Sequence, residues 1–261
     1  IFQHPIEGYN ISQLDWGTSD AKDVTLSFWV KSSVTGTFGG SFRSSTGNYS
    51  YVFEYTVNSA STWEYKSVNI SGATVDTWNS TNGSGINLLF SLGQGTTYAT
   101  STVGSWTSGN FHASTSETDL IANASATFQI TGVQLEVGDT ATPFEHRSYG
   151  DELAKCQRYF ELLDYSGSVG NAISNSTQWG GTTDQWGNIM YKYPKRATPS
   201  GSVSGSVIIY GKGNISTATT PTLQYISKVG LGIRVQPSSF TSDVGFIGNS
   251  SNFKLSVDAE L

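Results

Sequence analysis

In this sequence of 261 residues, the aromatic residues in glycine-rich segments are the side chains best suited to binding a ligand. An aromatic ring offers a broad apolar face with few rotamers to freeze, which suits stacking on the C–H surface of a sugar. Loops on a β scaffold commonly carry such residues. For each tryptophan the alternative is a structural role or a subunit contact. The candidate glycan-binding residues are Trp106, Tyr98, His112 and Arg43 in the first half of the chain, and Trp179 and Trp186 in the second.

Recognised catalytic motifs are absent from the sequence. It contains no G-x-S-x-G nucleophile elbow, no H-E-x-x-H zinc motif and no G-x-x-x-x-G-K-[ST] phosphate loop. A glycosidase needs two carboxylates beside the scissile bond, and distant positions could supply them in the fold. The acidic residues, however, gather in turns and around 145–152. We therefore expect a protein that is not an enzyme, with a glycan hydrolase as the less favoured alternative.

The composition argues against several classes of protein. Charged residues make up 13% of the chain, against roughly 25% in a typical soluble domain. Low charge with 13% aromatic residues argues against disorder, and the net charge of −6 argues against nucleic-acid binding. No apolar stretch approaches the roughly 20 residues of a membrane-spanning helix, so no membrane insertion is expected. The single cysteine excludes an intrachain disulfide.

Alternating apolar and polar residues predict β-strands through most of the chain. A period of two gives each strand one buried face. Many short strands separated by polar loops predict an all-β fold of the sandwich type. The clearest runs lie at 24–30, 51–57, 86–92 and 253–261, and further strands are expected at 159–165, 188–193, 203–210, 223–228 and 231–236.

Breaks in the alternation mark the expected turns and loops. The phase of the apolar residues slips at Gly132, which predicts a bulge or a break between strands. Trp63 opens a strand and is expected in the core. The segments rich in Gly, Ser and Asn that are expected to be loops are Gly36–Asn48, Ser71–Gly85 and Gly93–Asn110.

One short helix is predicted between two β domains. Gly150–Arg158 begins with acidic residues and ends with basic ones, an order that complements the helix dipole. We expect Cys156 to be a small buried residue of this helix. The predicted domains are a β-sandwich over residues 1–143, a helical hinge over 144–158 and a second β domain over 159–261.

Several motifs resemble a module that is common in tail-fibre and other virion proteins of bacteriophages, especially marine ones. The resemblance covers nearly the whole chain and is most specific in the run TPFEHRSYGDEL followed by CQRY. The matching segments are Trp16–Ser33, Thr62–Glu64, Asn82–Gly85, Ile130–Gly138, Thr142–Tyr159, Lys195–Pro199 and Asp258–Leu261.

The resemblance implies a jelly-roll sandwich similar to carbohydrate-binding modules, followed by a C-terminal β domain. It places the chain on the surface of a phage particle, with other virion proteins and a host cell-surface glycan as partners and a homotrimer as the expected assembly. A tail-fibre receptor-binding role is preferred, and a head-decoration or head-fibre role is the alternative. Because Ile1 is not an initiator methionine, we expect the chain to be a fragment.

Similar jelly-roll modules often hold a structural Ca²⁺ ion through carboxylates and backbone carbonyls. By this resemblance Glu7 and Glu136 are weak candidates for a calcium site. Ordinary surface or turn carboxylates are the favoured interpretation of both residues. No other cofactor is expected.

Overall fold

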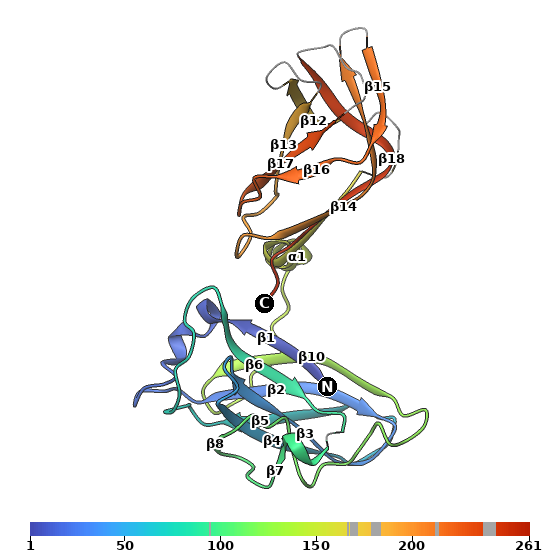
Figure 1. The fold of residues 1–261 in the computed structure, drawn as a ribbon. Helices are drawn as coiled ribbons and strands as arrows, with labels where there is room; N and C mark the ends of the chain where they lie inside the picture. Colours follow the sequence, from blue (N-terminus) through green and yellow to red (C-terminus); the bar gives the residue numbers. More distant parts are fainter. Residues whose placement is uncertain (94, 166, 168–171, 179–183, 212–213, 237–243) are drawn as a thin grey trace. The chain divides into compact units, whose positions relative to one another are not determined.

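The computed structural model describes residues 1–261 except 94, 166, 168–171, 179–183, 212–213 and 237–243 (Figure 1). Almost all strand pairs are antiparallel, and the described residues contain one α-helix. The predicted all-β class is therefore confirmed. The chain divides between His146 and Arg147 into two compact units, and each unit has a hydrophobic core of its own.

The first unit is a jelly-roll-like β-sandwich. Its strands are β1 (Phe2–Glu7), β2 (Val24–Ser32), β3 (Gly36–Ser44), β4 (Tyr49–Val57), β5 (Glu64–Ile70), β6 (Ser84–Phe90), β7 (Ala99–Thr100), β8 (Trp106–Ser108), β9 (Ala113–Ser114) and β10 (Phe128–Val137), with short 3-10 helices at Gly8–Asn10, Ser12–Leu14 and Thr96–Tyr98. One sheet has the order β1-β6-β3-β4-β8 and the other has the order β10-β2-β5. A two-stranded parallel pair joins β7 to β9.

Alternate residues of the two sheets form the core of this sandwich. Leu26 and Phe28 of β2 are fully buried, as are Phe42 of β3 and Phe53 of β4. Because successive side chains of a strand point to opposite faces, the residues between them lie on the outer face of their sheet.

The prediction that Gly36–Asn48 is a loop is wrong, because the first nine residues of this segment form β3. The glycines that suggested a loop allow close contact between strands. A Cβ atom on Gly39 would lie 2.3 Å from the carbonyl oxygen of Phe53, and one on Gly40 would lie 1.9 Å from that of Leu89. Only glycine fits these two positions.

The predicted irregularity at Gly132 is confirmed as a β-bulge. The register between β10 and β2 shifts between Thr131 and Gln134, while β10 continues through the shift. Gly132 has a φ of +59°, in the left-handed region that glycine adopts at little cost.

The second unit holds one helix and one large sheet. Its elements are α1 (Tyr149–Tyr159), β11 (Phe160–Asp164), β12 (Ala172–Gln178), β13 (Gln185–Met190), β14 (Ser200–Gly211), β15 (Asn214–Thr219), β16 (Thr222–Gln224), β17 (Gly230–Val235) and β18 (Val244–Asp258). The sheet order is β15-β14-β18-β12-β13-β17-β16, and β11 pairs with β18. The strand predicted over 223–228 ends early, because Tyr225 adopts a left-handed φ of +49°.

The predicted helix is present as α1, and Ser148 caps its start. Ser148 accepts a hydrogen bond from the backbone N–H of Asp151, which satisfies one of the free donors at the helix start. The end of the helix is tied to the second unit, since the backbone N–H of Arg196 donates to the carbonyl of Arg158. The prediction that Cys156 is buried is wrong: its side chain is exposed.

No helix in the described part of the chain is long and apolar enough to cross a membrane.

Candidate functional site

Tyr98 and His112 form a stacked aromatic pair in the first unit. Their ring centroids lie 4.6 Å apart and their planes differ by 4°. The parallel pairing of β7 with β9 positions them, because Tyr98 directly precedes β7 and His112 directly precedes β9. The backbone N–H of His112 also donates to the carbonyl of Tyr98 at 2.8 Å. Tyr98 remains 44% exposed, so an aromatic surface backed by an imidazole faces solvent.

Arg43 and Asn110 lie beside this stacked pair. The Nη1 group of Arg43 donates to Asn110 Oδ1 and to His112 Nε2. Since a guanidinium can only donate, His112 Nε2 accepts, and the neutral ring carries its proton on Nδ1. Tyr98, His112, Arg43 and Asn110 are hereafter called the Tyr98 platform.

Burial and the nearby guanidinium together set the protonation of the platform. Burial, and then the charge of Arg43, lower the pKa of His112 to about 4, so the imidazole is neutral at neutral pH. Burial also lowers the pKa of Arg43 below its usual value. Arg43 is therefore the one charged member of the platform.

The β4 strand fixes the segment that carries Asn110 and His112. Ser50 Oγ donates to the carbonyl of Gly109 at 2.6 Å and accepts from the backbone N–H of Phe111 at 2.9 Å. Ser50 pairs with Arg43 across β3 and β4, so both residues point to the same outer face of the sheet. The sheet thus positions the loop that carries these candidate side chains.

Trp106 belongs to a different cluster. Its ring lies 5.3 Å from that of Trp16 and 5.2 Å from that of Trp78, in edge-to-face contacts, and its Nε1 donates to the carbonyl of Ser71 at 2.8 Å. It also contacts Tyr51, which neighbours Ser50 and so faces the core side of the sheet. The structure brings Tyr98, His112 and Arg43 together and places Trp106 in the packing of the core.

In the second unit, Trp186 contacts both Arg234 and Tyr225. The guanidinium of Arg234 lies 5.7 Å from the indole centroid, and the Tyr225 ring lies 5.8 Å from it. Arg234 donates to Asp184 Oδ2 through Nε at 2.9 Å and Nη2 at 2.5 Å. The other predicted residue of this segment, Trp179, lies outside the described residues.

Tyr225 and Arg234 complete the Trp186 cluster and were not predicted from the sequence. Tyr225 is 81% exposed and is held in a left-handed conformation. The register of β13 against β17 places Arg234 directly opposite Trp186. An aromatic residue after a strand and an arginine inside one are weak signals alone, so only the pairing of the strands reveals the cluster.

Glu136 and Glu7, the two candidate calcium ligands, lie in different surroundings. Glu136 accepts hydrogen bonds from the hydroxyl and the backbone N–H of Thr142, and these bonds lower the pKa of its carboxyl group. Glu7 is buried at the end of β1. Among the residues that the structure describes, no group of three His, Cys, Asp or Glu side chains could hold a metal ion.

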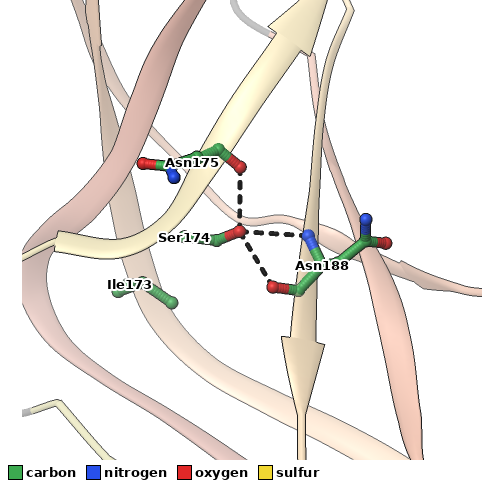
Figure 2. A pocket seen from close by; sticks show the side chains of 4 residues that line it. All are labelled: Ile173, Ser174, Asn175 and Asn188. Atoms are coloured by element: carbon green, nitrogen blue, oxygen red, sulfur yellow. Dashed lines mark hydrogen bonds between the residues drawn. The ribbon is translucent and has the colours of Figure 1, made fainter.

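A cavity of about 470 Å³ lies beside β12 and β13, lined by Ile173, Ser174, Asn175 and Asn188 (Figure 2). The hydroxyl oxygen of Ser174 lies 2.8 Å from the carbonyl oxygen of Asn175 and 2.9 Å from that of Asn188, which are alternative acceptors for its one proton, and it accepts from the backbone N–H of Asn188. This hydroxyl thus links β12 to β13.

The outer face of the three-stranded sheet carries a further pair of exposed rings. Trp29 and Tyr65 face each other across β2 and β5, with their centroids 5.5 Å apart. They are 44% and 46% exposed. Trp63, which was predicted to be buried, is 41% exposed because it precedes β5 and is not part of that strand.

Comparison with known proteins gives no family for this chain. No protein-family model matches it, and no curated protein matches it.

Proposed function

We propose that this chain is a bacteriophage virion protein that binds a host cell-surface glycan without catalysing a reaction. The observation that carries the proposal is the Tyr98 platform: an exposed aromatic ring with a guanidinium and an amide at its side. Stacking on the ring supplies affinity, and the planar hydrogen-bonding groups supply orientation. The motifs that resemble phage fibre proteins supply the setting, an appendage of the particle in which several copies bind together.

Many copies on one particle make weak sites effective. Linked sites raise the overall avidity far above that of one site. A trimeric fibre with one platform on each chain fits this mode of attachment. A head-decoration or head-fibre role is the alternative, and it requires no accessible sugar site.

The proposal predicts that Tyr98→Ala weakens binding to glycans while the fold persists. The loss of one stacking face should reduce the affinity about tenfold, which corresponds to about 1.4 kcal/mol of binding free energy. The measurement is binding of the full chain to an immobilised panel of neutral and acidic bacterial-type oligosaccharides.

Tyr65→Ala is the matched control, because Tyr65 is an equally exposed tyrosine on the other sheet. This variant should bind like wild type. Equal binding by Tyr98→Ala and wild type would contradict the assignment of the platform, and no glycan binding by the wild-type chain would favour the decoration role.

A further inference from the structure

We propose that the ligand of the Tyr98 platform is an acidic saccharide whose carboxylate or sulfate group binds Arg43. This inference rests on the proposed function and names the class of sugar. It depends on an uncompensated positive charge at one edge of the platform.

The guanidinium of Arg43 has no anionic partner among the described residues. Its Nη1 group donates only to neutral acceptors, Asn110 Oδ1 and His112 Nε2. Its Nε group is buried and donates to no described acceptor. The Nη2 group likewise has no described acceptor, and it is not among the buried polar atoms, so it is available to a ligand.

Three other partly or fully buried cations among the described residues are each paired with a carboxylate. Lys66 lies 2.7 Å from Glu64. The two further pairs are Lys195 with Glu161 at 2.7 Å and Arg234 with Asp184 at 2.5 Å. Burial of an unpaired charge is unfavourable, and Arg43 departs from the pattern of these pairs. An anion from outside the chain would complete the site.

The chemistry of the neighbouring groups selects an anionic sugar in preference to a free anion. Tyr98 stacks on His112 with the ring centroids 4.6 Å apart, and Arg43 donates to the same imidazole, so one ligand can reach both groups. His112 is neutral at neutral pH, so the platform carries a single positive charge on a chain with a net charge of −6. A guanidinium binds carboxylates and sulfates through planar, charge-assisted hydrogen bonds. The ring of the same sugar would stack on Tyr98.

Matched sugars that differ only in charge test the inference. The probes are oligogalacturonides and their methyl esters, and sulfated galactan oligosaccharides and their desulfated forms. Binding of the full chain to each probe is measured by calorimetry at low and at moderate salt concentration. The two pairs of probes distinguish a carboxylate from a sulfate ligand.

The variants are Arg43→Gln, Arg43→Lys and the control Lys31→Gln. Glutamine keeps a donor for Asn110 and His112 but removes the charge, whereas lysine keeps the charge and loses the planar fork. Lys31→Gln makes the same change in net charge on the other sheet, where β2 lies. An unchanged unfolding temperature of Arg43→Gln would show that the fold of this variant persists. If Arg43→Gln does not fold, Arg43→Lys serves as the test in its place.

The inference is supported if an acidic probe binds and its affinity falls at least about tenfold when the probe is esterified or desulfated. The affinity should fall by a similar factor in Arg43→Gln and should stay unchanged in Lys31→Gln. The binding should also weaken as salt is added. If charged and neutral probes bind equally and binding depends on Tyr98 alone, the inference is overturned and the proposed function stands. If the wild-type chain binds no probe of either kind, both are overturned.

Discussion

At the scale of single residues, Glu117 shows how burial of a carboxyl group affects stability. Both carboxylate oxygens are buried in the first unit. Burial raises the pKa of Glu117 to about 7, and the charges of Asp119 and Glu54 add to the effect. Interactions with Ser91 and with the backbone of Gly93 offset only part of this increase. The folded state therefore favours the protonated carboxyl group.

We predict that Glu117→Gln flattens the dependence of the stability of the first unit on pH. The pKa is higher in the folded than in the unfolded chain, so protonated Glu117 contributes fully below about pH 4.5 and its contribution is lost as the pH rises through 7. After discounting for partial exposure, we expect wild type to lose about 1–2 kcal/mol over this range.

Urea unfolding at pH 5 and pH 8 measures this difference. Glu145→Gln, a change at an exposed carboxyl group of the same unit, should keep the wild-type pH dependence. A Glu117→Gln chain that loses as much stability as wild type between the two pH values would show that another group is responsible.

Individual residues of the platform could be predicted, but their grouping could not. Tyr98, His112 and Arg43 are aromatic or planar polar residues in the first half of the chain, and the structure brings them together. The same reasoning selected Trp106, which packs into the core. Local sequence does not show that Trp106 meets Trp16, because the contact joins segments 90 positions apart.

At the scale of elements, periodicity predicted the strands whose two faces differ in polarity. It found β2, β4 and β6, each with a clear buried face. It missed β3, because Gly39 and Gly40 serve the close approach of neighbouring strands and resemble turn residues in the sequence. Glycine carries no side chain that could reveal the face on which it lies.

Three of the five tryptophans of the first unit pack together and hold segments of the chain against the sandwich. Trp16 and Trp78 come from two different connections and Trp106 from β8, and the three rings meet edge to face. We predict that Trp106→Ala destabilises the first unit by about 2–3 kcal/mol, less than for a fully buried ring because Trp106 is only partly buried.

Chemical unfolding of the full chain measures this loss. Trp63→Ala removes an exposed tryptophan of the same unit and should change the stability by about 0.5 kcal/mol or less. If Trp106→Ala leaves the stability unchanged but abolishes glycan binding, Trp106 belongs to the binding surface after all.

At the scale of the whole molecule, each unit is stabilised by different interactions. The first unit buries a core rich in aromatic rings, and the second buries a mainly aliphatic core. The second unit also contains a fully buried ion pair, in which Lys195 Nζ lies 2.7 Å from Glu161 Oε2 and also donates to the carbonyl of Gln157. Glu161 in turn accepts from the backbone N–H of Lys192.

We predict two thermal transitions, each sensitive to substitutions in one unit only. Lys195→Ala leaves the carboxylate of Glu161 buried without its cation, which should cost about 3–5 kcal/mol and lower only the transition of the second unit. Trp106→Ala should lower only the other transition. Differential scanning calorimetry of the full chain resolves the two.

The double variant Lys195→Met with Glu161→Leu separates charge from packing. It removes both buried charges and should recover most of the stability that Lys195→Ala loses, since replacing a whole buried pair by apolar residues is often close to neutral. If Lys195→Ala lowers both transitions by the same amount, the two cores unfold as one cooperative unit. In that case a loss of glycan binding in any core variant would report on global stability, and only substitutions at exposed residues such as Tyr98 would test the binding surface itself.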